Sequence, residues 1–534
     1  MTPSWSIPTD MTSETSAVTP IASSTLERVC PIDLRPLSPV QRSTDEEIKQ
    51  AVARAREAQR SWAERTLDER AKLMVRAAKS MLRRREEAMA LVREEVGKLD
   101  VEALFDEGLG HLDMLNQWIS VVREGTQRKK AKMHPIAFPG KRAFTELVPR
   151  GVIGAIAPWN FPIAGLYRAV YPALLCGNGI VVKPSEYTPK TSQWLVDSLA
   201  AELPTGLIST IYGDGAQGAA LIDAGIDACA FTGSCRTGRQ VMVRCAERGI
   251  PASIEMGGKD CAIVLADCDR ERTAAGITHW ALANVGQACG ALEVALVEEH
   301  IADDFVQHLC RTWSRLRVGP GEHHEVSPMA NRRQFDIVVE QVADAIAKGA
   351  KLVCGGAPTG TGLFFAPTIL DHCTEDMKVV RDETFGPVLA VMRVDGAADA
   401  VRRVNRSRYG LGASIWTSDI ERGQALAARL DVGIVSINNH SFTGGVAGLP
   451  WSGTRETGYS VANSVHALPT FVRPKALVID ENPKPDPFWM PWDNDVWELG
   501  NLLIDVQLFR LRRAWKIPLL AQKRVKTIRD FFRR

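Results

Sequence analysis

The chain has 534 residues, of which 45% are hydrophobic and 24% are charged, and its formal net charge is +2. Because that length exceeds one ordinary core, we expect a soluble globular protein with two or more domains. The 11 cysteines include no Cys-x-x-Cys pair and no paired Cys/His spacing, which argues against a zinc site and a secreted disulfide scaffold. We find no signal-peptide pattern and no apolar run near the ~18 residues of a membrane span, so we expect a cytoplasmic protein without metal.

Composition and the spacing of apolar residues change along the first half of the chain. Residues 1–30 are rich in Ser, Thr and Pro and predict a flexible leader. From 43 to 125 the apolar spacing predicts helices, the first of them opened by a polar cap and acidic residues. Between 151 and 255, short β-branched runs alternate with helical segments, which predicts a parallel sheet that binds ligands beyond the carboxyl ends of its strands. The expected strands are 151–157, 180–182, 207–212, 227–231 and 252–255, and the expected helices are 162–176, 188–201, 217–224 and 237–248.

A second α/β stretch covers residues 260–438. It includes an expected strand over 262–265 and expected helices over 274–285 and 333–348. Beyond it, residues 482–492 hold four prolines and two tryptophans, which predict a rigid linker rather than a helix.

Cys289 is the candidate nucleophile. It lies in the sequence Asn284-Val285-Gly286-Gln287-Ala288-Cys289-Gly290, where glycine on both sides lets backbone and ligand approach the sulfur. A thiolate in such a setting can form a covalent intermediate with a carbonyl carbon. The assignment depends on a base, an oxyanion donor and an electron acceptor elsewhere in the chain.

Two features at strand ends predict a cofactor site. Gly233 and Ser234 follow one strand and open a helix, where backbone N–H groups can bind a pyrophosphate; an ordinary βα turn is the alternative. Lys183 and Glu186 follow another strand of the same sheet and could hydrogen-bond ribose hydroxyls; a surface ion pair is the alternative.

Two further strand ends supply polar groups for catalysis. The Asn160 amide, held between two prolines, is a candidate donor to an oxyanion, unless it only stabilises a proline-rich turn. Glu255 precedes a Gly-Gly turn and is a candidate general base, unless it is a solvated strand-end acid.

In combination and in this order, these segments resemble the aldehyde dehydrogenase superfamily over about residues 30–475. The resemblance rests on Pro158-Trp159-Asn160-Phe161-Pro162, Lys183, Glu186, Phe231-Thr232-Gly233-Ser234, Glu255-Met256-Gly257-Gly258-Lys259, Gly286-Gln287-Ala288-Cys289 and Glu383-Thr384-Phe385-Gly386-Pro387. It implies an α/β fold with two Rossmann-like parallel-sheet domains and a small β oligomerisation arm, assembled as a homodimer or homotetramer.

The resemblance also implies domain bounds. An NAD-binding domain would cover 31–256, with an arm hairpin near 131–150, and a catalytic domain would cover 257–440. Residues 441–480 would return to the cofactor domain and add an oligomerisation strand, before a Pro/Trp linker and a basic tail over 481–534.

The activity implied is oxidation of an aldehyde to a carboxylic acid with NAD(P)⁺. Cys289 would form a thiohemiacetal and then a thioester, Asn160 and the Cys289 N–H would hold the oxyanion, and Glu255 would activate the hydrolytic water. A carboxylate at the position of Glu255 favours hydrolysis over transfer to coenzyme A, and Glu186 favours NAD, with NADP as the alternative. The implied cofactor contacts are Ile156, Pro158, Trp159, Lys183, Glu186, Gly233, Ser234, Glu383 and Phe385. A family-fold protein with a structural role and little turnover, and a semialdehyde dehydrogenase, are the alternative functions.

The sequence departs from the family's pattern at three places. Ala169, beside Arg168, stands where many relatives have a lysine that is thought to relay protons to the base. The segment Gly448–Glu456 lacks a lysine and a glycine of the usual motif, and Val294 replaces a common arginine. These changes leave the identity of the aldehyde open.

The C-terminal tail is strongly basic. Residues 510–534 contain ten Lys or Arg and one Asp, so the rest of the chain is mildly acidic. Two apolar stripes, separated by a helix break at Pro518, predict a basic amphipathic tail over 497–534 that binds an anionic membrane surface and brings the enzyme to apolar or fatty aldehydes. The alternatives are packing on a neighbouring subunit and a solvated tail, and we expect no nucleic-acid binding. The stripes are Leu499, Leu502, Leu503, Val506 and Phe509, and Val525, Ile528, Phe531 and Phe532.

Overall fold

The computed structural model describes residues 24–134, 138 and 140–533. The leader expected over 1–30 therefore lies mostly outside the described residues, and its last part is strand β1 (Thr25–Val29), which pairs antiparallel with β2 (Pro36–Gln41). The chain forms two compact units. The first consists of the chain up to Gly125 and Pro149–Arg473, and the second of Thr126–Val148 and Pro474–Arg534.

The predicted helical region over 43–125 is confirmed. Its first two helices both begin with a capping box, in which a threonine hydroxyl and a glutamate three residues later each accept a hydrogen bond from the other's backbone N–H. Thr44 and Glu47 form the first box, and Thr66 and Glu69 the second. The helices are α1 (Asp45–Glu64), α2 (Leu67–Arg83), α3 (Arg85–Glu95), α4 (Asp100–Glu102), a π-helical turn (Ala103–Gly108) and α5 (Gly110–Gly125).

A five-stranded parallel sheet follows, in the order β7-β6-β5-β8-β9. The chain moves from β5 outward to β7 and then returns to β8, so right-handed crossovers place α6 and α7 on one face and α8 and α9 on the other. The switch point lies between β5 and β8. All the strands and helices predicted for this region are present: β5 (Val152–Ile156), α6 (Ala164–Leu175), β6 (Gly179–Lys183), α7 (Pro189–Ala200), β7 (Ile208–Thr210), α8 (Gly215–Asp223), β8 (Ala228–Thr232), α9 (Cys235–Glu247) and β9 (Ala252–Glu255).

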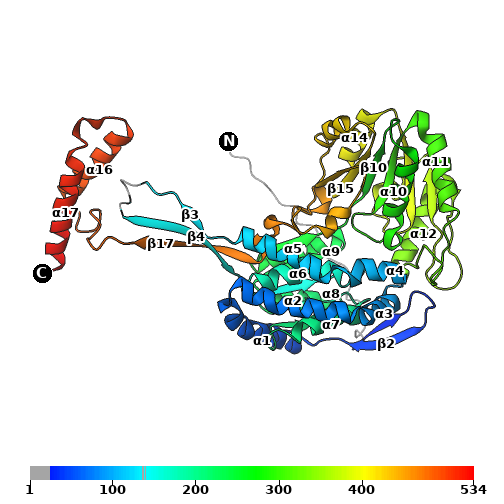
Figure 1. The fold of residues 1–534 in the computed structure, drawn as a ribbon, viewed down its shortest axis with the longest axis horizontal. Coiled ribbons are helices and arrows are strands. Elements are labelled where there is room, and N and C mark those ends of the chain that lie inside the picture. Colours follow the sequence, from blue (N-terminus) through cyan, green and yellow to red (C-terminus); the bar gives the residue numbers. More distant parts are fainter. Residues whose placement is uncertain (1–23, 135–137, 139, 534) are drawn as a thin grey trace, which may run out of the picture. The chain divides into compact units, whose positions relative to one another are not determined.

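The second sheet has seven strands in the order β12-β13-β14-β11-β10-β15-β16, and only β12 runs antiparallel to its neighbour. Two apolar clusters cover its faces: α10 and α11 contribute to one, and α12, α14 and α15 to the other (Figure 1). The elements are β10 (Asp260–Val264), α10 (Arg270–Leu282), β11 (Leu292–Glu298), α11 (Glu299–Trp313), α12 (Arg332–Ala347), β12 (Lys351–Cys354), β13 (Thr368–Asp371), α13 (Lys378–Arg381), β14 (Val388–Val394), α14 (Ala397–Arg406), β15 (Gly412–Trp416), α15 (Ile420–Ala427) and β16 (Ile434–Ile437). The predicted α/β class with two parallel-sheet layers is confirmed.

The two sheets are joined end to end. Residues 256–259 connect the carboxyl end of β9 directly to the amino end of β10. Cys289 lies shortly before the amino end of β11, and Phe385 shortly before that of β14. The site therefore forms at the carboxyl ends of the first sheet and the amino ends of the second.

The second unit contains a three-stranded sheet and two helices. The sheet has the order β17-β4-β3, formed by β3 (Lys129–Ala131), β4 (Lys141–Pro149) and β17 (Val472–Asp480). Helices α16 (Asn494–Gln507) and α17 (Lys516–Phe532) pack against each other and are drawn in red in Figure 1. The predicted linker over 482–492 contains no helix.

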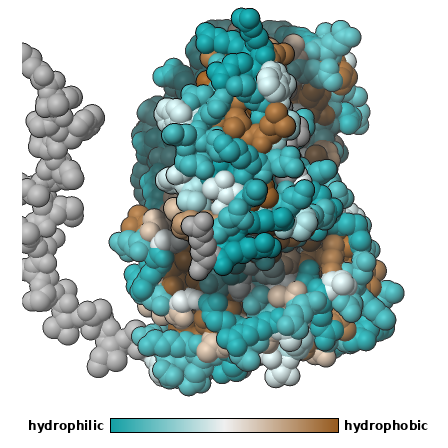
Figure 2. All heavy atoms as spheres, turned by 90° about the vertical axis from the view of Figure 1, so that its left-hand side faces the viewer, coloured by the Kyte–Doolittle hydropathy of each residue, from teal (hydrophilic) through white to brown (hydrophobic). Residues whose placement is uncertain are grey.

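The helix break predicted at Pro518 is wrong. Helix α16 already ends at Gln507, Phe509 adopts a positive φ of 57°, and Pro518 lies in the first turn of α17. Proline is tolerated there because the first N–H groups of a helix have no intrahelical acceptor. Among the described residues, no helix is both long and apolar enough to span a bilayer. The face drawn in Figure 2 is mainly hydrophilic, with scattered apolar patches.

Candidate active site

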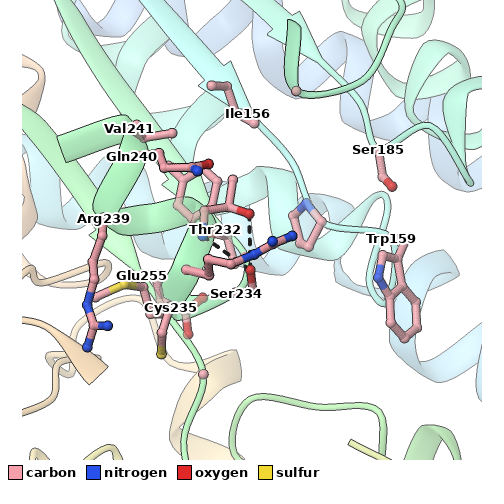
Figure 3. Close-up of a pocket in the computed structure, with 18 of the residues that line it drawn as sticks. Ile156, Trp159, Ser185, Thr232, Ser234, Cys235, Arg239, Gln240, Val241 and Glu255 are labelled. Atoms are coloured by element: carbon pink, nitrogen blue, oxygen red, sulfur yellow. Dashed lines mark hydrogen bonds between the residues drawn. The ribbon is translucent and has the colours of Figure 1, made fainter. Parts of the chain in front are cut away.

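One cavity of about 1280 Å³ is lined by every residue that the sequence predicted for catalysis or cofactor binding. Its size exceeds the ~300–1,000 Å³ of typical small-molecule sites, which suits a dinucleotide together with a substrate. The predicted residues in its lining are Ile156, Pro158, Trp159, Asn160, Lys183, Glu186, Gly233, Ser234, Glu255, Cys289, Glu383 and Phe385. Figure 3 shows part of this lining, including Trp159, Ser234 and Glu255.

The backbone before Cys289 adopts an unusual conformation. Asn284 and Val285 have positive φ values of 51° and 59°, which cost free energy in non-glycine residues and most in a β-branched one. Gly286 follows with φ of 71°, and a Cβ there would lie 2.3 Å from the Gly386 carbonyl oxygen. The Asn284 amide stabilises the turn by donating to the Gln287 carbonyl at 3.0 Å.

Asn160 is held beside this turn. Its side-chain amide donates to the Gln287 backbone carbonyl at 2.9 Å, and the backbone carbonyl of Asn160 accepts from the Asn284 side-chain amide at 3.0 Å. A side-chain amide has two N–H groups, so one is left for an oxyanion. The sequence-predicted pairing of Asn160 with the loop of Cys289 is thus formed by direct contacts.

Glu255 is the last residue of β9 and is buried, not solvated. Its Oε1 accepts a hydrogen bond from the Trp451 indole at 3.1 Å, while its Oε2 is buried without a hydrogen-bond partner among the described residues. Burial raises the pKa of this carboxyl, and the nearby Arg168 charge, the Cys289 thiol and Trp451 offset part of the increase. A carboxylate with a raised pKa and a free oxygen is suited to accept a proton.

The Cys289 thiol lies next to this carboxylate. Burial raises the pKa of the thiol well above its usual value, the negative charge of Glu255 raises it further, and the Arg168 charge acts in the opposite direction. The sulfur therefore stays protonated at neutral pH until a base takes its proton. The thiol is partly exposed, and the buried Glu255 carboxylate is its neighbour.

One part of the cavity is built by the first sheet. Lys183 ends β6 and is buried, with its Nζ donating to the Gly213 carbonyl at 2.9 Å and 3.9 Å from Glu186 Oε2. Burial lowers the pKa of this amine. Ser234 caps α9, where its Oγ accepts from the Thr237 N–H at 3.4 Å, as the dashed lines in Figure 3 indicate. The α9 N-terminus thus opens into the cavity, as an anion site requires.

The part of the cavity before β14 contains Glu383 and Phe385. Burial, reinforced by the charge of Glu293, raises the pKa of Glu383 to about 8. Its Oε1 accepts from the Gly258 N–H at 3.2 Å, and the neighbouring Gly257 has no space for a Cβ, which would lie 2.2 Å from that oxygen. The Phe385 ring packs edge-on against Trp159, with 5.4 Å between the ring centroids.

Sequence reasoning missed a buried ion pair that fixes this segment. The Lys259 ammonium contacts the Glu293 carboxylate and donates to the Thr384 hydroxyl at 2.8 Å. The two Glu293 oxygens accept from the N–H groups of Thr384 and Phe385, each at 2.8 Å. A lysine after Gly-Gly and a glutamate shortly after the cysteine were visible in the sequence, but only the fold shows that they meet.

Two more missed residues, Arg168 and Trp451, lie on the substrate side of Glu255. The Arg168 guanidinium carbon lies 4.5 Å from the centroid of the Trp451 ring. Trp451 was noted only as part of an altered segment, and Arg168 only as the neighbour of Ala169. Their sequence separation of more than 280 positions explains why no local signal connected them.

Comparisons with known proteins agree on one family. The model of the aldehyde dehydrogenase family matches residues 18–477. A 4,4'-diapolycopene aldehyde oxidase from Methylomonas sp is 36% identical over 476 residues, which is 89% of either chain. The NAD⁺ complex of a Bacillus cereus aldehyde dehydrogenase is 30% identical, with a TM-score of 0.82 over 86% of this chain and 94% of that one. An NADP-dependent enzyme of E. coli is 27% identical, with a TM-score of 0.80 over 85% of this chain and 95% of that one.

The cavity and these matches define the protein class. The chain belongs to the aldehyde dehydrogenase family. It is an NAD(P)-dependent oxidoreductase that oxidises aldehydes, as the sequence predicted.

The buried Lys259–Glu293 pair yields a prediction about stability. Lys259→Met leaves the Glu293 carboxylate buried without its counter-charge, so we expect the free energy of unfolding to fall by about 3–5 kcal/mol. Urea denaturation at pH 7 measures it. Lys378→Met is the matched control, because its partner Glu340 is exposed and such pairs contribute at most ~1 kcal/mol. Equal losses in the two variants would contradict the prediction.

Proposed function

We propose that the chain oxidises an apolar aldehyde to a carboxylic acid with NAD⁺, with Cys289 as nucleophile. The observation that supports this most strongly is that Cys289, the buried Glu255 carboxylate and Asn160 line one cavity. In this proposal residues 31–256 and 441–480 hold the cofactor and residues 257–440 supply the nucleophile. Association as a homodimer or homotetramer, through the edge of the β17-β4-β3 sheet, is part of the same proposal.

The first half-reaction forms the acyl enzyme. Glu255 accepts the thiol proton as the Cys289 sulfur bonds to the aldehyde carbon, and the carbonyl π electrons move to oxygen. The free N–H of the Asn160 amide and the Cys289 backbone N–H bind that oxyanion. When NAD⁺ is bound it accepts a hydride from the same carbon and is reduced to NADH, which leaves a thioester on Cys289.

The second half-reaction hydrolyses the thioester. Glu255 first loses the proton it took from the thiol and then accepts one from a water that attacks the acyl carbon. The carbon–sulfur bond breaks, the sulfur leaves as a thiolate, and the product is a carboxylic acid. The free Oε2 and raised pKa of Glu255 suit both proton transfers.

The residues around the cavity fit a dinucleotide. In this proposal Lys183 and Glu186 bind the adenosine ribose, the α9 N-terminus at Gly233 and Ser234 binds the pyrophosphate, and Glu383 binds the nicotinamide ribose, all of them in the lining of one cavity. Ile156, Pro158, Trp159 and Phe385 supply the apolar walls. The Glu186 carboxylate repels a 2′-phosphate, so NAD is favoured and NADP is the alternative.

The proposed activity predicts NADH formation from aldehydes. We expect purified protein with NAD⁺ to produce NADH at 340 nm from a panel of uncharged aldehydes, with kcat/KM rising with apolar chain length because each buried CH₂ contributes ~0.8 kcal/mol. Cys289→Ala should abolish NADH formation while NAD⁺ binding is retained, and Cys310→Ala, on α11, is the matched control. Wild-type protein that binds NAD⁺ but oxidises none of the aldehydes would favour the structural role, and a preference for carboxylated aldehydes would favour a semialdehyde substrate.

The role of Glu255 predicts separate effects on the two half-reactions. Glu255→Gln keeps the shape of the side chain but removes the base, so steady-state turnover should fall at least ~100-fold. The NADH burst of the first turnover should slow much less, because a solvent base can take the thiol proton. Stopped-flow absorbance separates the two phases. Loss of burst and steady state in equal proportion would contradict a hydrolytic role.

A second proposal concerns the tail: the hairpin of α16 and α17 binds an anionic membrane surface. The tail stripes are partly used inside the hairpin, where Leu499, Leu502 and Ile528 are buried. Arg524 is fully buried beside them and donates to the carbonyls of Pro487, Trp489 and Pro491 and to the Asp493 carboxylate. The hairpin is thus a folded element rather than a solvated tail.

The connection between the two helices is the candidate membrane contact. This hairpin tip, residues 508–515, exposes Leu508, Phe509, Leu511 and Trp515 next to Arg510, Arg512 and Arg513. Phe509 is 89% exposed. Exposed aromatic and aliphatic side chains enter the interface between headgroups and acyl chains, and each nearby Arg or Lys adds about 1 kcal/mol on an anionic surface.

A membrane-bound hairpin also bears on the substrate. The Methylomonas relative bears the name of a 4,4'-diapolycopene aldehyde oxidase, and it is similar over 89% of this chain. An apolar aldehyde of that size partitions into bilayers. We therefore propose apolar, lipid-derived aldehydes as substrates, taken up by a cytoplasmic enzyme that is peripheral on the membrane.

Liposome flotation tests the hairpin tip. Wild-type protein should float with vesicles containing 30% phosphatidylserine, float less as salt rises, and stay down with pure phosphatidylcholine, since the attraction is partly electrostatic (~10 Å screening length at 0.1 M). Phe509→Glu/Leu511→Glu should reduce flotation at least ~10-fold. Phe105→Glu, at another exposed aromatic residue, is the matched control. If wild-type protein does not float and Phe509→Glu/Leu511→Glu lowers the oligomer mass, the tip binds a second copy of the chain instead.

A further inference from the structure

Arg168 lies beside the proposed active site, although its position on α6 is remote in sequence from the catalytic pair. Its guanidinium stacks on the Trp451 indole at 4.5 Å and donates to the Gly444 carbonyl at 3.3 Å. Arg168 and Glu255 also line one small cavity of about 30 Å³, roughly the volume of one water molecule. The cation and the carboxylate therefore face the same confined space.

Trp451 connects the two groups. Its indole N–H donates to Glu255 Oε1 at 3.1 Å, and its ring packs with Leu411 and Ala462 beside Cys289. A buried indole packed among these neighbours keeps its N–H direction fixed. The guanidinium contributes to that hold, because a planar cation over an aromatic face is attracted by ~0.5–2 kcal/mol.

Two carboxyl groups near Glu255 oppose its ionisation, Asp260 on β10 and Glu383 on the segment before β14. The neutral Cys289 thiol acts in the other direction, and its thiolate would be a third negative neighbour. Arg168 on α6 is the cation that acts on both Glu255 and Cys289. In a buried site the Coulomb interaction is weakly screened, so one cation among three acids has a large effect.

We propose that Arg168 is a positioning residue for aldehyde oxidation: stacked on Trp451, it fixes the indole hydrogen bond to Glu255, and its charge keeps Glu255 ionised and helps Cys289 to lose its proton. The inference rests on the proposed roles of those two residues. It gives Arg168 no contact with the reacting atoms. Its effect passes through the base and the nucleophile, and it is independent of the charge of the substrate.

The sign of the pH effect follows from the charges. Burial already raises the pKa of Glu255, and Arg168 opposes that increase. Without Arg168 the carboxylate would become protonated at higher pH, so the acid limb of kcat would move to higher pH. The pKa of Cys289 would rise for the same reason, so its alkylation would also require higher pH.

The test compares Arg168→Gln, Arg168→Lys and Trp451→Phe with wild-type protein. We expect Arg168→Gln to move the acid limb of kcat, measured with an uncharged aldehyde, upward by at least ~1 pH unit. Arg168→Lys keeps the charge but loses the planar stack, so it should restore most of that shift. Trp451→Phe keeps a ring under the guanidinium but removes the N–H donor, and should give a smaller shift in the same direction.

A second readout needs neither turnover nor cofactor. Iodoacetamide alkylation of Cys289, followed by peptide mass mapping over a pH series, should show its midpoint move upward by at least ~1 unit in Arg168→Gln. Arg248→Gln is the matched control, because that arginine pairs with Asp223 and lines neither the large cavity nor the small one that Arg168 shares with Glu255. Thermal melting checks that each variant is folded.

The outcomes are distinguishable. Unchanged pH midpoints in Arg168→Gln, with a raised KM confined to aldehydes that bear a carboxylate, would overturn the inference and make Arg168 a substrate anchor. Equal shifts in Arg168→Gln and Arg168→Lys would also overturn it, because the retained charge would then have no effect. If wild-type protein oxidised no aldehyde, the proposed function would fail, while the alkylation series would still decide whether Arg168 acts on Cys289.

Discussion

The direct connection of β9 to β10 is the constraint on which the site depends. Residues 256–259 are too short to let the two sheets separate, so Glu255 at the carboxyl end of one sheet lies beside the amino ends of the other. The turn before Cys289 and the segment from Glu383 to Phe385 enter from the second sheet at that edge. The Lys259–Glu293 pair then ties both segments together through backbone N–H groups, which makes the geometry of nucleophile, base and cofactor wall one structural unit.

Burial is the common cause of the electrostatics in this unit. It raises the pKa values of Glu255, Cys289 and Glu383 and lowers that of Lys183. Each shift favours the neutral form of the group. The positive φ values of Asn284 and Val285 cost conformational free energy, which the Asn284 side-chain hydrogen bond partly offsets. This turn directs the Cys289 sulfur to the cavity.

The sequence predicted the elements of the first sheet well because β-branched runs alternate cleanly with helices there; of the second sheet it predicted one strand and two helices. Nine of the twelve candidate site residues end or follow a strand of the first sheet, and the parallel sheet brings those strand ends together. Cys289, Glu383 and Phe385 instead precede strands of the second sheet. It could not predict that Arg168, Trp451 and Glu255 meet, since side-chain contacts between distant segments leave no local pattern. It misplaced the tail's helix break for a different reason: proline stops a helix only in its interior, and Pro518 lies in a first turn, where the missing N–H has no consequence.

The residues of the site are therefore held by two kinds of contact. Cys289, Asn160 and Glu255 lie on elements fixed by the two sheets and by buried hydrogen bonds, which leaves them little freedom to move. Arg168 and Trp451 come from a helix and a loop whose contact is a stacked pair, and a stack tolerates exchange of either partner more readily than a buried ion pair does. Variation at such a contact changes the pKa of the base while the base keeps its place at the end of β9. Substrate preference and pH range can accordingly diverge within one fold while the reaction stays the same.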